Sequence, residues 1–168
     1  METNALPAYD MSDNATGCCP RFKPAGWDAQ ELHFRDKAFV RATTRSLMHV
    51  PVNMGKVFAR VMDHITKADA MDPTSYIVLS RDTSSLAGEH LFAVRKDVPD
   101  ETMTTLSGDF ITKVFEGPYR RVGQWHTEMA DLVRARGAEP KSVWFFYTTC
   151  PKCAKAYGEN YVVGVAQL

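Results

Sequence analysis

Four cysteines stand in two close pairs, and their type and spacing point to metal or redox chemistry. Cys18 and Cys19 are adjacent near the start, and Cys150 and Cys153 flank a Pro-Lys step near the end. A two-residue spacer lets both thiolates reach one tetrahedral metal ion at a sulfur–metal distance of about 2.3 Å. We therefore expect a structural zinc ion held by Cys18, Cys19, Cys150 and Cys153, provided that the first segment crosses to the last part of the chain.

Other interpretations of the cysteines remain open. Adjacent cysteines seldom bind one ion, because consecutive side chains diverge, so a histidine or water would replace one member of the first pair. The cysteines would otherwise form a dithiol redox or thiol-reactive site, or stay buried without a ligand. A thioredoxin-type motif is disfavoured, because such a motif opens a helix after a strand, whereas we expect residues 150–153 to form a turn between two strands.

Glu116 is the best candidate for a functional carboxylate. It ends an apolar strand immediately before Gly117 and Pro118. Buried beside aromatic rings, it would suit a catalytic general acid or base, and ionised it would hold a cationic ligand. The alternative is a solvated carboxylate at the end of a strand.

Aromatic and polar side chains around the predicted strand ends are candidates for a ligand site. The strand 143–147 alternates its faces, so Phe145 and Tyr147 lie on one side, and Trp144 and Phe146 lie on the other. One of these sides must pack beneath helices, and the other must face a groove. The candidate ligand-binding residues are His49, Glu116, Tyr119, Phe145, Tyr147 and Tyr161.

Apolar periodicity predicts the same order of elements twice. Apolar stripes at helical spacing run over residues 54–65 and 122–133, the first ending before Pro73 and the second before Gly137. Runs rich in β-branched and aromatic residues predict strands. These strands cover residues 37–49, 76–80 and 90–96 in the first half, and 108–116, 142–147 and 160–166 in the second.

A shift of 67 residues superimposes the two halves. It aligns Pro51 with Pro118 and His49 with Glu116. We therefore expect an internal duplication, with pseudo-repeats about 37–98 and 104–168. The repeats would form a single α+β domain over residues 18–168, with residues 18–28 pinned by two aromatic anchors and residues 1–17 a flexible tail, because few large apolar side chains occur there.

The second half resembles a known family. The stretch GDFITKVFEGPY over 108–119, the helix with Trp125 and Leu132, and the following Arg136-Gly137 are similar to the GyrI-like small-molecule-binding domains, which are related to the SOUL haem-binding fold. This resemblance implies two strand, helix, strand, strand units that form one curved antiparallel sheet with two helices on one face. It also implies a ligand groove on the other face, lined by aromatic residues and one acidic side chain.

The resemblance implies a protein that binds a hydrophobic small molecule, cationic if Glu116 is ionised, for sequestration or detoxification. The alternative is a hydrolase of an electrophilic small molecule, with Glu116 or a groove tyrosine activating water. Some family members hydrolyse cyclopropane-bearing toxins with an acidic residue late in the chain, but residues 161–168 contain no carboxylate here. A second alternative is a thiol- or metal-based sensor.

Net charge and the absence of known motifs exclude several classes of partner and activity. Twenty basic residues balance twenty acidic ones, so no net charge attracts nucleic acid or membrane lipids, and we expect neither as a partner. The first residues lack a basic start and an apolar core, which predicts a cytoplasmic protein. We expect a monomer or a homodimer that binds a small molecule. Phosphate-loop, HExxH and GxSxG motifs are absent from the sequence, which gives no support to nucleotide hydrolysis, zincin proteolysis or α/β-hydrolase chemistry.

Overall fold

The computed structural model describes residues 2–168, which form an α+β fold of seven strands and three α-helices. A single 3₁₀ turn, Tyr119–Arg121, precedes the second helix. The elements in chain order are β1 (Glu31–Leu47), β2 (Val50–Pro51), α1 (Met54–Lys67), β3 (Val78–Ser84), β4 (Ala87–Ala93), β5 (Thr102–Glu116), α2 (Val122–Ala135), β6 (Val143–Tyr147), α3 (Pro151–Tyr157) and β7 (Tyr161–Gln167).

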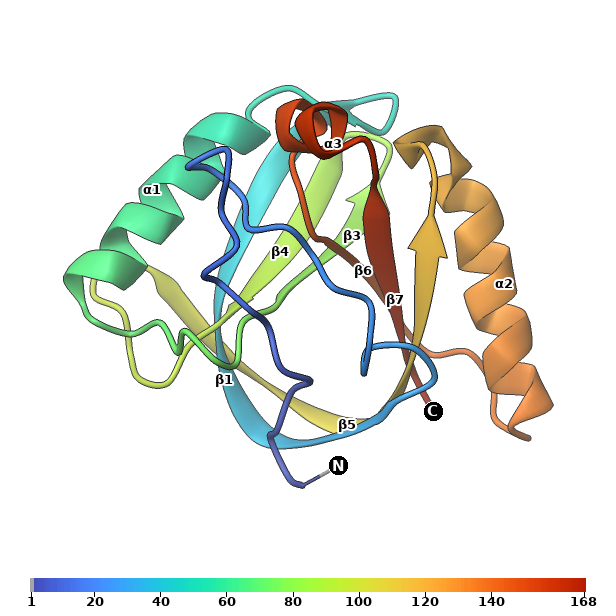
Figure 1. Cartoon of the computed structure of the whole chain (residues 1–168). Coiled ribbons are helices and arrows are strands. Elements are labelled where there is room, and N and C mark those ends of the chain that lie inside the picture. Colours follow the sequence, from blue (N-terminus) through green and yellow to red (C-terminus); the bar gives the residue numbers. More distant parts are fainter. Residues whose placement is uncertain (1) are drawn as a thin grey trace.

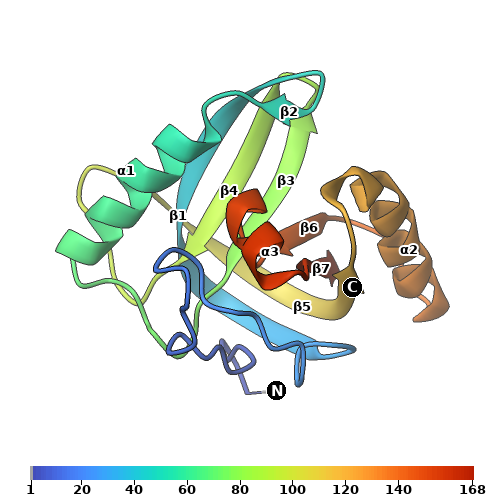
Figure 2. The same ribbon diagram turned by 45° about the horizontal axis from the view of Figure 1, so that its top comes forward.

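The strands form one antiparallel sheet that closes on itself. Its order is β2-β1-β4-β3-β6-β7-β5, and β1 also pairs with β5. The closing pair β1–β5 is long, whereas β3 and β6 share a single pair of residues, Ser80 and Phe145. Figure 2 shows β2 at the end of the part of the sheet formed by β1, β3 and β4. The sheet therefore has an inner face and an outer face.

The order strand, helix, strand, strand occurs twice, as β1-α1-β3-β4 and β5-α2-β6-β7. Within the sheet the two halves also have matching neighbours, β1-β4-β3 and β5-β7-β6. This order confirms the α+β class and the antiparallel sheet. The internal duplication itself stays a prediction, and β2 and α3 have no counterpart in the other half.

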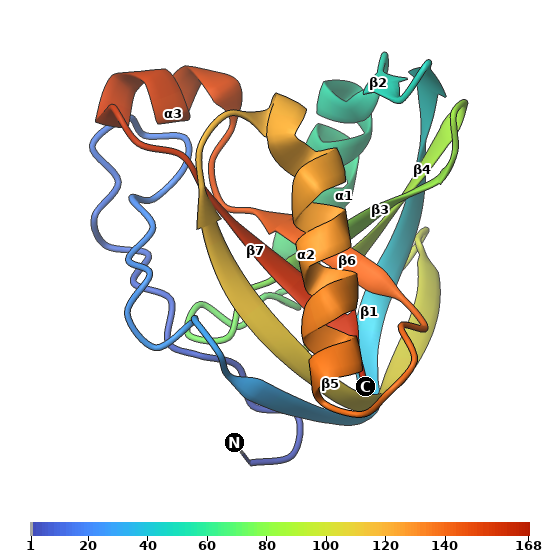
Figure 3. The ribbon, with the colours of Figure 1, turned by 90° about the vertical axis from the view of Figure 1, so that its right-hand side faces the viewer.

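Helices α1 and α2 cover the outer face, each over its own half (Figures 1 and 3). Their buried residues recur every four positions, as in Val57, Val61 and Ile65 of α1, so each apolar stripe faces the sheet. In α2 the corresponding stripe is Trp125, Met129 and Val133. No described helix is long and apolar enough to cross a membrane.

The inner face is filled by the chain's own side chains, where the resemblance had placed a ligand groove. Sheet residues such as Phe34, Phe110 and Phe146 pack there against the segment that precedes β1. That segment contributes Leu6, Tyr9, Phe22 and Trp27 to the same core. Trp27 is fully buried, which confirms its predicted role as an anchor. Aromatic groups thus occupy the space that a ligand in such a groove would need.

The N-terminal segment, defined here as residues 2–30, differs from the flexible tail expected over residues 1–17. Leu6 and Tyr9 are buried, and the Trp27 indole donates a hydrogen bond to the carbonyl of Ala8 at 3.0 Å. Asn4 is hydrogen-bonded to His33 of β1 at 2.8 Å. Figure 1 shows the segment in blue, crossing in front of the sheet. Leu6 and Tyr9 are sufficient to order this part of the chain, because the closed sheet offers them an apolar surface. Residue 1 lies outside the described part.

Candidate metal centre

The four cysteines meet where the N-terminal segment passes α3. Their Sγ atoms all lie within 4.8 Å of one another, and Cys18 Sγ is 3.7 Å from Cys19 Sγ. All four are free thiols rather than disulfides. In a tetrahedral site with sulfur–metal bonds of about 2.3 Å, the sulfur atoms are separated by about 3.8 Å. The four sulfur atoms therefore fit the shell of one metal ion, and the expected crossing of the first segment to the last part of the chain is confirmed.

The second pair of cysteines opens a helix, not the plain turn between strands that we expected. Cys150 is the N-cap of α3, and Cys153 lies in its first turn. Pro151 suits the first helical position, where its missing N–H would have no partner, and Gly158 ends the helix with a left-handed φ of 70°. Both sulfurs consequently project from one rigid turn of helix.

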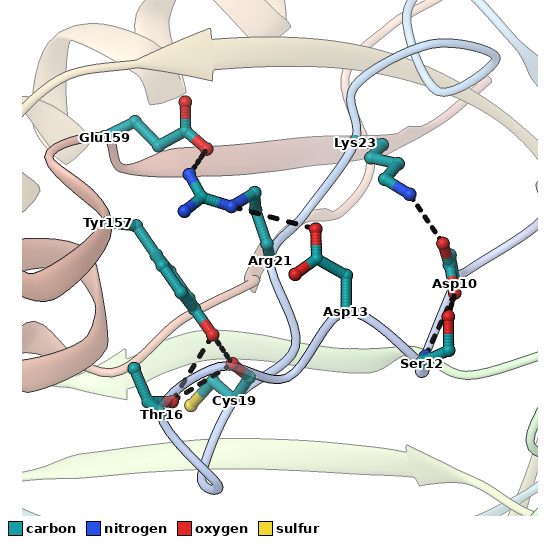
Figure 4. A network of polar contacts seen from close by, with 9 residues as sticks. All are labelled: Asp10, Ser12, Asp13, Thr16, Cys19, Arg21, Lys23, Tyr157 and Glu159. Atoms are coloured by element: carbon teal, nitrogen blue, oxygen red, sulfur yellow. Dashed lines mark hydrogen bonds and ion pairs between the residues drawn. The ribbon is translucent and has the colours of Figure 1, made fainter.

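A network of polar contacts fastens the first pair of cysteines to α3 (Figure 4). The Tyr157 hydroxyl donates to the carbonyl of Cys19 at 2.6 Å and lies 3.3 Å from the Thr16 hydroxyl. The Thr16 hydroxyl is 3.2 Å from Cys153 Sγ. The backbone N–H of Cys150 donates to Cys19 Sγ at 3.4 Å. The geometry of the four sulfurs is thus supported by contacts that do not involve a metal.

Arg21 adds a second attachment beside the cysteines. Its guanidinium lies 4.4 Å from the centre of the Tyr157 ring and 3.2 Å from a carboxylate oxygen of Glu159 (Figure 4). It also approaches Asp13 at 3.8 Å. Cation–π and ionic contacts therefore hold the N-terminal segment against the end of α3 and against Glu159, which follows it.

The surroundings change the acidity of the thiols in opposite directions. The hydrogen bond with Thr16 lowers the pKa of the Cys153 thiol to about 7. Burial raises the pKa of the Cys19 thiol far above its usual range. The pKa values of these two thiols are therefore shifted apart, whereas a bound divalent metal deprotonates its thiol ligands.

The donor set fits zinc. Four thiolates at tetrahedral spacing are a common ligand set of structural zinc sites, and soft sulfur ligands disfavour magnesium and calcium. Such a shell is complete without water. A metal in it has no open position for a substrate, so the centre suits a structural role.

Three of the predicted ligand residues come together elsewhere, on the outer face next to α2. The rings of Tyr119 and Tyr147 are 5.8 Å apart, and those of Phe145 and Tyr147 are 6.3 Å apart. Burial raises the pKa of Tyr147 to about 12, with a further contribution from the negative charge of Asp82. Phe145 and Tyr147 therefore pack on the helix side, whereas Trp144 and Phe146 face inward.

The remaining predicted residues lie apart from one another. His49 belongs to the turn after β1, and its Nδ1 is 2.8 Å from a carboxylate oxygen of Asp82. Tyr161 packs in the inner core, where its ring is 5.9 Å from Phe22. Glu116 is exposed at the end of β5 and is aligned with Tyr161 on β7. The structure thus pairs His49 with Asp82, and it does not bury Glu116 among aromatic rings.

Several carboxylates with well-defined surroundings were not predicted from the sequence, among them Asp82 and Glu89. Asp82 pairs with His49 at 2.8 Å, and its negative charge contributes to the raised pKa of Tyr147. No local pattern distinguishes Asp82 from other polar residues of β3. Glu89 is buried between Arg41 and Arg81, at 2.7 and 2.8 Å. Burial opposes its ionisation, but the hydrogen bonds from both arginines bring the pKa of Glu89 below its usual range. An acidic residue within the apolar run of β4 is the signal that would have found it.

The fold and the cysteine centre define the class of this protein: an α+β domain with a closed antiparallel sheet and a cluster of four thiols able to hold a metal. The chain belongs to a family described as Bacterial hydrolase, whose model matches residues 9–168. The match starts inside the N-terminal segment and includes all four cysteines. A comparison with curated proteins gave no match. The family description indicates hydrolase activity in general terms, without a substrate or a mechanism.

Proposed function

We propose that the protein binds one zinc ion through Cys18, Cys19, Cys150 and Cys153, and that this ion fastens the N-terminal segment over the closed sheet. The observation that supports the proposal is the approach of all four Sγ atoms within 4.8 Å of one another. Two of these sulfurs come from the N-terminal segment and two from the start of α3. The metal therefore joins parts of the chain that are distant in sequence.

The zinc ion has a structural role in this proposal. Four protein ligands leave no position for the water that a catalytic zinc activates. Because the complete set of ligands forms only when the N-terminal segment is docked, binding of the metal favours the folded state. A dithiol redox role needs only one pair of cysteines, whereas the structure gathers both pairs at the spacing of a single ion.

Elemental analysis and thermal unfolding test the zinc centre. We expect one zinc ion per chain in protein purified under reducing conditions, and a Tm lower by several degrees after chelation, since the ion binds the folded state alone. The Cys153→Ser variant should lose the metal and the sensitivity to chelator. The Lys152→Ala variant changes an exposed residue between Cys150 and Cys153, and it should retain both the metal and the sensitivity to chelator. Metal-free protein with an unchanged Tm would show that the thiols serve another purpose.

A second function, binding of a hydrophobic cation, is favoured by the cluster on the outer face. Tyr119 and Tyr147 are half-buried beside the buried Phe145, and the negative charge of Asp82 acts on Tyr147. Aromatic faces and a carboxylate together attract a flat or bulky organic cation. This is the ligand class implied by the resemblance to GyrI-like domains. In this proposal Asp82 has the role of the acidic side chain, which we had expected for Glu116.

Titration with tetraphenylphosphonium tests this second function. We expect the fluorescence of the protein to change on binding, and Tyr147→Ala to weaken binding about tenfold, because an aromatic ring that contacts the cation is lost. Tyr161→Ala is the matched control, since Tyr161 packs in the inner core and should not affect affinity. Equal affinities of wild type and Tyr147→Ala would exclude this cluster as the site. Hydrolysis at Glu116 is not part of the proposal, because that carboxylate is exposed.

A further inference from the structure

A histidine and a buried carboxylate meet at the C-terminal end of α1. The Nδ1 atom of His64 is 2.8 Å from an Oε1 atom of Glu101, the residue immediately before β5. The Glu101 side chain is only 4% exposed, and Arg60 contacts both of its oxygens, at 3.1 and 3.3 Å. The Glu101 carboxylate therefore lies between the guanidinium of Arg60 and the imidazole of His64.

A cavity of about 170 Å³ lies beside this pair. Its lining consists of His64, Lys67, Ala68, Pro99 and Asp100. The Nδ1 atom of His64 is buried, whereas 28% of the side chain is exposed. Since Nδ1 is engaged by Glu101, the other ring nitrogen, Nε2, is left to interact with a molecule in the cavity.

Burial of the carboxylate distinguishes this pair from two other histidine–carboxylate pairs in the structure. The carboxylates of Asp109, next to His33, and Asp82, next to His49, are 48% and 53% exposed. Glu101 is shielded from water, so its charge acts on the imidazole with less screening. Asp100, at the rim of the cavity, has a left-handed φ of 65°, a conformation that non-glycine residues seldom adopt and that often occurs at functional sites.

We propose that His64 is the general base of a hydrolytic site in this cavity, with Glu101 as its positioning residue, and that the substrate is a small ester with a good leaving group. The site is separate from the zinc centre and from the aromatic cluster. This chain, as a member of the family described as Bacterial hydrolase, therefore has a candidate catalytic residue that does not depend on the metal.

The reaction needs only the ester and water. His64 Nε2 takes a proton from a water molecule while the water oxygen forms a bond to the acyl carbon. The resulting tetrahedral species then breaks its bond to the alcohol oxygen, and the imidazolium returns the proton to that oxygen. The products are a carboxylic acid and an alcohol. Lys67 also lines the cavity, and its ammonium group is 2.6 Å from a carboxylate oxygen of Asp63 on the same helix.

The size and chemistry of the cavity define the substrate class. Pockets for drug-sized ligands are about 300–1,000 Å³, so this cavity suits an acyl group of a few carbons. Ala68 and Pro99 give it an apolar part. In this scheme water, rather than a serine or cysteine side chain, is the nucleophile. General-base assistance by a histidine to a water molecule suffices for activated esters and not for amides, whose leaving group is poor.

The Nδ1 atom of His64 is 2.8 Å from the Glu101 carboxylate, but the contact lacks the alignment of a good hydrogen bond. Catalytic hydrogen bonds are often poorly aligned in a ligand-free enzyme and tighten when substrate binds. Substitution of Glu101 should accordingly lower kcat with little change in KM, because it disturbs the orientation of the base and not the walls of the cavity.

Hydrolysis of 4-nitrophenyl acetate by the zinc-loaded protein tests the proposal. We expect His64→Gln to lower kcat/KM at least tenfold, and Glu101→Gln to lower kcat with an unchanged KM. The rate should fall at acidic pH, because a protonated imidazole cannot accept a proton; the charged groups around the ring are Arg60, Lys67, Asp100 and Glu101. This dependence on pH should disappear in His64→Gln.

His33→Gln is the matched control, because His33 also pairs with a carboxylate but does not line this cavity. It should retain the wild-type rate, and slow acylation of the cysteines contributes equally to all variants. Zinc content and Tm, measured on the same samples, separate a failure of this site from a failure of the zinc centre or of folding. A wild-type rate no higher than that of correctly folded His64→Gln would overturn the proposal.

Discussion

His90 lies in the core beneath α1 and accepts or donates two hydrogen bonds there. Its Nε2 is 2.9 Å from the Thr44 hydroxyl, its Nδ1 is 2.8 Å from the Ser80 hydroxyl, and its ring packs against Phe58. A neutral imidazole supplies one donor and one acceptor, and hydroxyl groups rotate to match either. Burial lowers the pKa of His90 to about 4. The folded protein therefore keeps this side chain uncharged at neutral pH.

Stability should decrease as the pH falls from about 6.5 towards 4. In that range the unfolded chain protonates His90, whose ordinary pKa is about 6.5, and the folded chain does not. The contribution of the neutral His90 to the free energy of unfolding is fully present above about pH 6.5, and the loss of this contribution amounts to about 3 kcal/mol at most. Urea unfolding at pH 7 and pH 4.5 measures it. His90→Gln, which keeps a donor and an acceptor, should lose less stability than wild type; equal losses would exclude His90 as the cause.

The types and spacing of single residues were sufficient to predict that the four cysteines meet, whereas the surroundings of the predicted ligand residues could not be derived in this way. A two-residue spacer restricts where the sulfurs of Cys150 and Cys153 point, whatever the rest of the fold does. The burial of Glu116 depends instead on which strands and loops surround the end of β5. The alternation of strand 143–147 predicted that Phe145 and Tyr147 share a face, and the structure confirms this arrangement. The sequence did not decide which face, because both contain aromatic rings.

The N-terminal segment behaves as an additional structural element even though it has little regular structure. Its apolar anchors fill the inner face, and its cysteines and Arg21 attach it to α3 and to Glu159. Propensity and periodicity cannot detect such a segment, because its order comes from the surface on which it packs. The short helix α3 was missed for a related reason, since seven residues contain too few turns to show an apolar stripe.

Limited trypsin digestion tests how the metal fastens this segment. We expect cleavage after Arg21 to become much faster when zinc is removed. Before the bond can enter the active site of the protease, Arg21 must detach from α3 and Phe22 must leave the core in which it is buried. Cleavage after Arg134, an exposed residue of α2, should change little and provides the internal comparison. Mass spectrometry identifies the fragments. Equal rates of cleavage after Arg21 with and without zinc would mean that packing alone holds the segment.

For the whole molecule, the order of elements was predictable and the closure of the sheet was not. Periodicity located α1, α2 and most strands, because each carries its own apolar pattern. The long pairing of β1 with β5 arises from the curvature of all the strands together. Closure turns the expected open groove into an interior, and the N-terminal segment fills it. The candidate sites outside that interior, at Tyr147 and at His64, depend on contacts between distant elements and have no local signature.

The position of the N-terminal segment has a consequence for the synthesis of the protein. The segment leaves the ribosome first, but the surface that receives Phe22 and Trp27 is complete only when β7 has been made. Cys19 must wait for Cys150, 131 positions later. At translation rates of about 5–20 residues per second, this delay is on the order of ten seconds. During that time the nascent chain displays aromatic side chains that chaperones recognise, and the last step of folding joins the oldest part of the chain to the newest.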